Sequence, residues 1–195
     1  MKFREFHPFA AQNIMWLASH YGAPTTVVEI GVFQGATTFS MVEHFATDNS
    51  QYRHYAIDPF VKYDDMPHAD TIEAEPIFRA NLDECELSNH IEFIHDTSWN
   101  GLMDLHRRGV KADLIYVDGD HSSEGALDDI VLSFALLKPG GILLCDDATD
   151  WRYREHPARP TCRFAVDGFV HCNWNRLHVL RLPSNTQQGI QKLCP

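Results

Sequence analysis

Acidic side chains stand at the ends of five short apolar segments, and this is the strongest chemical signal in the sequence. The acids are Glu29, Asp58, Asp96, Asp118 and the pair Asp146-Asp147. Turns and helix caps favour aspartate, which accounts for one or two such positions. Five in succession favour a shared site, because ligands of an open parallel sheet bind beyond the carboxyl ends of its strands.

The first acid introduces a glycine-rich turn, Glu29-Ile30-Gly31-Val32-Phe33-Gln34-Gly35. Glycine permits a sharp turn from strand to helix and lets the backbone approach a ligand. The G-x-x-x-G spacing lacks the middle glycine of the dinucleotide fingerprint, and such a turn can also serve only to pack a helix on a sheet. Glu29 favours a binding role for Gly31 and Gly35, because a carboxylate there engages the ammonium of an amino-acid moiety.

Two further strand ends offer contacts to a nucleoside. Asp58 lies where an acid accepts two hydrogen bonds from ribose hydroxyls, and a cap of the turn before Pro59 is its structural alternative. Asp96, Thr97 and Ser98 are placed to contact the amino group and edge of an adenine. Thr97 or Ser98 can equally cap the following helix, and the two roles are compatible.

His121 follows Asp118 and Asp120 and is expected to face the same cleft. An imidazole titrates near neutral pH, so His121 is a candidate general base, and Asp118 is grouped with it as a catalytic candidate. A histidine in a loop is more often a structural hydrogen-bonding group, and both interpretations stay open.

These residues have to be positioned by alternating strands and helices. Short β-branched runs predict strands at 26–30, 52–58, 91–95 and 113–117, and a fifth at 142–145 after a break at Lys138-Pro139-Gly140-Gly141. Apolar residues at helical spacing predict helices at 9–21, 35–46, 73–87 and 99–108, and one with an apolar stripe from Leu127 to Leu137. Such alternation predicts parallel strands with helices on both faces of one sheet.

The pattern changes after Asp147. Residues 161–171 predict a helix, and residues 176–182 and 189–194 predict two strands joined by a Pro-Ser-Asn turn. A direct joint between two strands predicts an antiparallel pair at one edge of the sheet. The loops at 61–70 and 148–160 are expected to select the substrate, and the second combines aromatic side chains with arginines.

Composition limits the class of protein. The chain has 195 residues, of which 44% are hydrophobic and 22% charged, as expected of one globular domain. Its net charge of −11 repels phosphate backbones and argues against a nucleic-acid partner. No apolar run approaches the roughly 20 residues that cross a bilayer, and the amino terminus is a poor signal peptide. We therefore expect a cytoplasmic protein without a membrane partner.

Four segments, in order, resemble successive motifs of class I S-adenosylmethionine-dependent methyltransferases. They are VVEIGVFQG, YAIDPF, DLIYVDGDHSSEGALDDI and LLKPGGILLCDD, which together span residues 26–147. The V-D-G-D-H-S run, the E-G that follows and the late K-P-G-G are similar to the branch of macrocin-type and cephalosporin-biosynthetic O-methyltransferases. The resemblance implies a Rossmann-like α/β fold, with a seven-stranded, mostly parallel sheet, an antiparallel last strand and helices on both faces.

The resemblance also implies how the chain is organised and what it does. Residues 1–195 would form a single domain, with an N-terminal helix (1–22), a cofactor-binding core (26–147) and a segment with the lid loop, a helix and the edge hairpin (148–195). The cofactor would be S-adenosylmethionine, and the reaction the O-methylation of a small hydroxylated molecule. The edge hairpin and the first helix are candidate surfaces for a homo-oligomer.

A divalent cation is part of the same expectation. Relatives hold it with an acid after the fourth strand and an acidic pair after the fifth, which here are Asp118, Asp146 and Asp147. Three carboxylates suit Mg²⁺, which would hold the acceptor oxygen in line with the methyl group. The Asp-Asp pair departs from the Glu-Asp and Asp-Asn of relatives, and Asp146 and Asp147 can instead cap the loop.

Two other functions fit part of the pattern. A nicotinamide-dependent oxidoreductase would share the fold, but the middle glycine and a Tyr-x-x-x-Lys set are missing from the sequence. A non-catalytic protein that keeps the fold to bind the cofactor or a partner subunit is the second alternative. The full set of strand-end acids counts against it.

Overall fold

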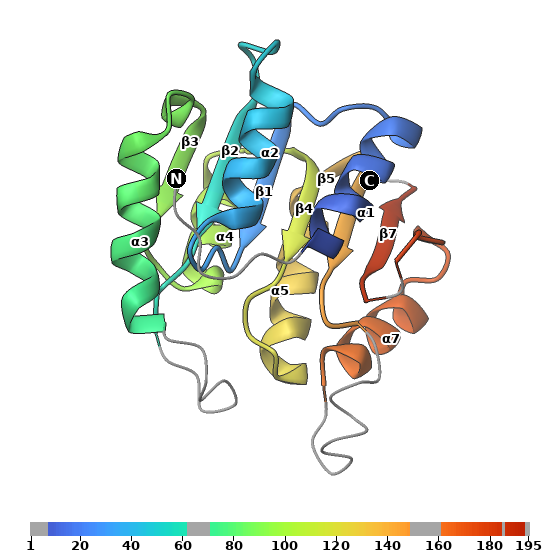
Figure 1. Cartoon of the computed structure of the whole chain (residues 1–195). Helices are drawn as coiled ribbons and strands as arrows, with labels where there is room; N and C mark the ends of the chain where they lie inside the picture. Colours follow the sequence, from blue (N-terminus) through green and yellow to red (C-terminus); the bar gives the residue numbers. More distant parts are fainter. Residues whose placement is uncertain (1–7, 62–70, 149–160, 185, 194–195) are drawn as a thin grey trace.

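The computed structural model describes residues 8–61, 71–148, 161–184 and 186–193, which form one seven-stranded sheet between two layers of helices (Figure 1). The strands are β1 (Thr26–Ile30), β2 (Arg53–Ile57), β3 (Ile91–Ile94), β4 (Ala112–Val117), β5 (Leu137–Cys145), β6 (Leu177–Leu180) and β7 (Gln188–Lys192). Their order across the sheet is β3-β2-β1-β4-β5-β7-β6.

Strand pairing confirms the predicted fold class. β1 pairs in parallel with β2 and β4, β2 with β3, and β4 with β5. β7 is antiparallel to both β5 and β6, and it lies between them. The predicted hairpin is therefore at the edge of the sheet, and its second strand is the inner one.

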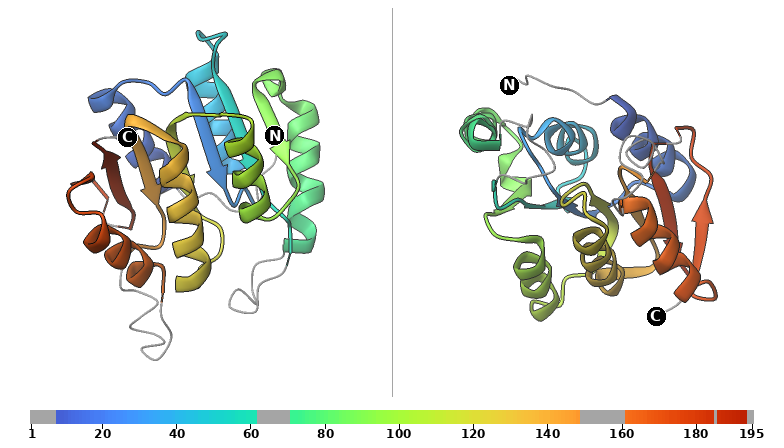
Figure 2. Two further views of the ribbon diagram at one scale, coloured as in Figure 1. Left: turned by 180° about the vertical axis from the view of Figure 1, so that it is seen from behind. Right: turned by 90° about the horizontal axis from the view of Figure 1, so that it is seen from below.

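The helices divide between the two faces of the sheet (Figure 2). One layer contains α1 (Pro8–Tyr21), α2 (Ala36–Ala46) and α3 (Thr71–Glu84), and the other contains α4 (Ser98–Arg107), α5 (Ser123–Leu136) and α7 (Cys162–Cys172). Each layer has its own apolar core. Ile130 of α5 and Phe169 of α7 belong to the core on one face, and Ile14 of α1 and Met41 of α2 to a core on the other.

Two predicted boundaries differ from the structure by more than two residues. The third predicted helix ends at Glu84 and is followed by a separate 3₁₀ helix, Ser88–His90. The Lys-Pro-Gly-Gly segment does not break the chain before β5, because this strand already begins at Leu137, which pairs with Ala112. The glycines are accommodated by an irregularity in the register between β4 and β5, and Gly140 has a φ of 85°.

Most of the two predicted substrate-selecting loops, residues 62–70 and 149–160, lies outside the described residues. In the part of the chain that is described, no helix is long and apolar enough to cross a bilayer.

Candidate active site

The register of the parallel strands brings the predicted site residues to one edge of the sheet. Ile30 at the end of β1 is paired with Ile57 of β2 and with Val117 of β4, and Val117 is paired in turn with Cys145 of β5. The next residue of each strand therefore leaves the sheet at the same level. These residues are Gly31, Asp58, Asp118 and Asp146.

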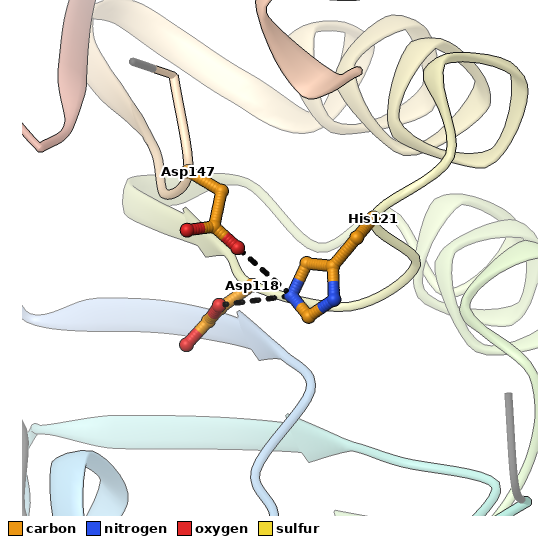
Figure 3. A group of neighbouring side chains, drawn as sticks. All are labelled: Asp118, His121 and Asp147. Atoms are coloured by element: carbon orange, nitrogen blue, oxygen red, sulfur yellow. Dashed lines mark ion pairs between the residues drawn. The ribbon is translucent and has the colours of Figure 1, made fainter. Parts of the chain in front are cut away.

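Three side chains meet beyond β4 and β5 (Figure 3). Nε2 of His121 lies 3.1 Å from Oδ2 of Asp147 and 3.9 Å from Oδ1 of Asp118. His121 is held on the loop before α5, where Ser122 caps the helix by accepting a hydrogen bond from the backbone N–H of Gly125. The imidazole is thus flanked by two carboxylates, which would stabilise its protonated form if it acted as a general base.

The surroundings of these three side chains disfavour a negative charge on Asp118. A small cavity beside it has apolar walls that include Ile130, Cys145 and Val166. Burial, reinforced by the nearby charge of Asp146, raises the pKa of Asp118 to about 7, and His121 partly opposes that rise. Two carboxylates and an imidazole in such a place can share protons or a bound cation.

Asp146 and Asp147 are neighbours in sequence but point in different directions. Asp147 has a φ of 49°, an uncommon value for a residue other than glycine, and its carboxylate reaches His121. Oδ2 of Asp146 accepts hydrogen bonds from the hydroxyl of Tyr116 and from Nε2 of Gln187, and its Oδ1 accepts the backbone N–H of Asp147. Of the three predicted cation ligands, the structure therefore groups Asp118 and Asp147 with His121.

A divalent cation fits this group. Asp118, His121 and Asp147 each offer one ligand atom, and these atoms lie within 4.8 Å of one another. Carboxylate oxygens suit Mg²⁺ and Mn²⁺, whereas an imidazole is a better ligand for transition metals than for Mg²⁺. The metal role of Asp118, Asp146 and Asp147 stays a prediction.

The glycines of the first turn are required by the packing of the protein itself. Gly31 has a φ of 81°, and a Cβ there would lie 2.0 Å from the carbonyl oxygen of Asp118. Gly35 has a φ of 87°, and a Cβ there would lie 2.3 Å from the ring of Phe39. This turn therefore needs glycine at both positions even before a ligand is considered.

Glu29 is buried in the sheet, with 1% of its surface exposed. Its Oε2 lies 2.8 Å from Nε2 of His54, and Nδ1 of His54 lies 2.9 Å from the hydroxyl of Tyr52. This chain of buried polar groups holds the Glu29 side chain in one orientation. Contact between Glu29 and the ammonium of a ligand stays a prediction.

Asp58 is bonded to the backbone around it. Its Oδ2 accepts the N–H groups of Val32 and Phe33, and its Oδ1 accepts that of Phe60. Burial raises the pKa of Asp58, and these three N–H groups limit the rise. Because a carboxylate offers about four lone-pair positions, this geometry leaves about one for a ribose hydroxyl.

The Asp96 group caps a helix, as its structural alternative predicted. Thr97 is the N-cap of α4 and accepts the backbone N–H of Asn100. Oδ1 of Asp96 accepts hydrogen bonds from the side chain of Asn100 and from the N–H of Thr97, and both lower the pKa of Asp96. Asp96 and Thr97 are exposed at the ligand edge of the sheet, so an adenine contact is compatible with the cap.

The sequence did not reveal which residues form hydrogen bonds with the acids of the site. Tyr116 and Gln187 bond to Asp146, and His54 bonds to Glu29. A tyrosine or histidine inside a strand is indistinguishable in sequence from a core residue. Gln187 is 41 positions from Asp146, and only the insertion of β7 beside β5 brings them together.

Known proteins resemble this chain in sequence motif and in fold. A family described as a methyltransferase domain matches residues 28–148. No curated protein matches the chain in sequence.

Solved structures give the fold comparison. An O-methyltransferase from Bacillus cereus in complex with S-adenosylhomocysteine (SAH) has a TM-score of 0.72 and 13% identity, covering 98% of this chain and 84% of that one. The O-methyltransferase TomG of tomaymycin synthesis from Streptomyces achromogenes, in complex with S-adenosylmethionine (SAM), gives 0.69 and 14%, covering 98% and 82%. The N-methyltransferase NodS from Bradyrhizobium japonicum, in complex with SAH, gives 0.62 and 17%, covering 94% and 85%.

Proposed function

Because this chain belongs to the methyltransferase-domain family, we propose that it transfers the methyl group of S-adenosylmethionine to a hydroxyl oxygen of a small molecule. The observation that carries the proposal is the imidazole of His121 between the carboxylates of Asp118 and Asp147, at the edge where the parallel strands end. The motif resemblance and the SAM- or SAH-bound O-methyltransferases of the same fold support it.

The cofactor would lie along the turn from Gly31 to Gly35 and across the end of β2. S-adenosylmethionine supplies an electrophilic methyl group on a positively charged sulfonium. Glu29 and Asp118 make this edge of the sheet acidic, which favours a sulfonium and an ammonium over the pyrophosphate of a dinucleotide. Asp58 would accept a ribose hydroxyl, and the Asp96-Thr97-Ser98 group would contact the adenine.

His121 would accept the proton of the acceptor hydroxyl on its imidazole ring. As this proton leaves, the hydroxyl oxygen could bond to the methyl carbon, whose bond to sulfur would break and leave S-adenosylhomocysteine. Asp118 and Asp147 would stabilise the imidazolium that forms, because both face the same nitrogen. Methyl transfer needs no covalent intermediate with the enzyme, so holding the reacting atoms in line would supply much of the rate enhancement.

A divalent cation would assist if it bound beside this histidine. It would hold the acceptor oxygen and lower the pKa of the hydroxyl. The geometry supports Asp118 and Asp147 as its ligands. Both oxygens of Asp146, the third predicted ligand, accept hydrogen bonds from protein donors.

The proposal is tested by turnover. Purified protein is incubated with S-adenosylmethionine and a panel of sugars and phenols, with Mg²⁺, with Mn²⁺ or with EDTA, and S-adenosylhomocysteine is quantified. We expect acceptor-dependent product that EDTA diminishes. Cofactor binding without turnover on any hydroxylated acceptor would favour a non-catalytic protein, and binding of a nicotinamide dinucleotide instead would favour an oxidoreductase.

A further inference from the structure

A series of hydrogen bonds, the middle one buried, connects α1 and the turn before β7 to the acid pair. The backbone N–H of Ser184 donates to Oδ1 of Asn13 at 3.1 Å. Nδ2 of Asn13 donates to Oε1 of Gln187 at 2.8 Å. Nε2 of Gln187 donates to Oδ2 of Asp146 at 3.2 Å. Four residues from three parts of the chain are thus linked in series.

The first hydrogen bond sets the donor-to-acceptor direction of the whole series. A backbone N–H can only donate, so Ser184 must face the oxygen of the Asn13 amide. The amino group of Asn13 then faces Gln187 and requires the oxygen of that amide. The amino group of Gln187 is left to face Asp146. Each amide orientation therefore follows from the previous one. As a result, the amino group of Gln187 donates a hydrogen bond to the Asp146 carboxylate.

The setting makes this donor effective. Asn13 is fully buried and Gln187 is 5% exposed, so water has little access to the bond between these two amides. Gln187 also donates to the hydroxyl of Tyr116 at 3.3 Å, and that hydroxyl lies 3.1 Å from Oδ2 of Asp118. One amide thus contacts Asp146 directly and reaches Asp118 through Tyr116.

Asn13 and Gln187 both lie outside residues 28–148, the part of the chain that the methyltransferase family matches. We infer that Gln187, oriented by Asn13, is a positioning residue that holds the Asp146 carboxylate against Tyr116, so that Asp118 and Asp147 are the carboxylates that bind the divalent cation. This inference rests on the proposed function. It means that α1 and the β6–β7 turn complete a site whose acids come from the matched core.

The test measures cation binding directly. EDTA-treated wild-type protein and variants are titrated with Mn²⁺ by calorimetry, and their thermal unfolding and binding of S-adenosylmethionine are recorded in parallel. Gln187→Met keeps the length of the side chain and removes its donor. Gln191→Met is the matched control on the adjoining strand β7, because the Gln191 amide bonds to the carbonyl of Gly140.

We expect Gln187→Met to weaken Mn²⁺ binding about 10- to 100-fold, the usual effect of disturbing the hydrogen bonds that orient a metal ligand, because Gln187 supports the Tyr116 hydroxyl that bonds to Asp118. Gln191→Met should bind Mn²⁺ as the wild type does. Asn13→Leu should weaken binding in the wild-type background and add nothing in the Gln187→Met background, because Asn13 acts through Gln187. A loss of folding alone would not produce this non-additivity.

Three results would overturn all or part of the inference. Unchanged Mn²⁺ affinity in a folded Gln187→Met, with the wild type binding both Mn²⁺ and S-adenosylmethionine, would remove the positioning role and leave the proposed function intact. Additive effects of the two substitutions would remove the link through Asn13. A wild-type protein that binds S-adenosylmethionine but no Mn²⁺ would overturn both the cation part of the proposed function and this inference.

Discussion

Single backbone and side-chain conformations decide how the acids after β5 are used. The positive φ of Asp147 sends its carboxylate to His121, while Asp146 turns to Tyr116 and Gln187. The sequence shows two adjacent aspartates and cannot tell them apart, because the left-handed conformation of Asp147 depends on the loop around it. His121, by contrast, could be placed beside Asp118 from sequence, because only two residues separate them.

Replacement of His121 tests its role as a base. His121→Gln keeps a polar side chain and removes the proton acceptor, so we expect kcat to fall about 10²- to 10⁴-fold. Binding of S-adenosylmethionine, measured by calorimetry, should stay within about twofold of the wild type. An unchanged kcat would instead assign His121 a structural role.

Asp129 makes stability depend on pH. It is 2% exposed on α5, and its Oδ2 has no hydrogen-bond partner among the residues that the structure describes. Burial raises the pKa of Asp129 to about 7, with a hydrogen bond from Ser98 opposing the rise. Between pH of about 4 and 7 the folded state therefore retains a proton that the unfolded state has lost. The free energy of unfolding should fall by about 1.4 kcal/mol per pH unit over this window because of Asp129.

Asp129→Asn should remove this contribution and flatten the pH dependence, measured by urea unfolding at pH 5, 6 and 7. Asp128→Asn is the matched control, because Asp128 is the exposed neighbour on the same helix. An equal slope in Asp129→Asn and in the wild type would contradict the account.

At the scale of elements, the sequence predicts strand and helix order well because each segment carries a local apolar period. β1 lies where the β-branched run placed it, at Thr26–Ile30. The start of β5 was wrong because Pro139 and the two glycines resemble a break, and only pairing with β4 shows that the strand includes them. Contacts between elements, such as Asn13 with Gln187, leave no local pattern at all.

The turn between β1 and α2 gives a prediction at this scale. In Gly31→Ala the added Cβ meets the Asp118 carbonyl at 2.0 Å, and in Gly109→Ala nothing lies within 4 Å, although both glycines have positive φ. We expect Gly109→Ala to lower the free energy of unfolding by about 1–2 kcal/mol, the cost of the left-handed conformation. Gly31→Ala should cost at least twice as much in urea denaturation. Equal losses would show that the turn is not held against the Asp118 loop.

In the whole molecule, the first helix and the turn before β7 meet beside the carboxyl end of β5. α1 and the turn before β7 both contribute to the support of Asp146, and β7 lies beside β5. The organisation as a single domain over residues 1–195, with a core at 26–147, stays a prediction. The acceptor is the part that sequence and structure leave to experiment, since most of the two loops expected to select it lies outside the described residues.

The central claim, that this edge of the sheet binds S-adenosylmethionine, is tested most directly by calorimetric titration of the EDTA-treated protein with that cofactor. We predict binding in the micromolar range in the wild type and its loss in Asp58→Ala, since Asp58 both holds the turn at Val32 and Phe33 and offers an acceptor to the ribose. Absence of binding in the wild type, with or without Mg²⁺, would contradict the account and leave a methyltransferase fold that serves another ligand.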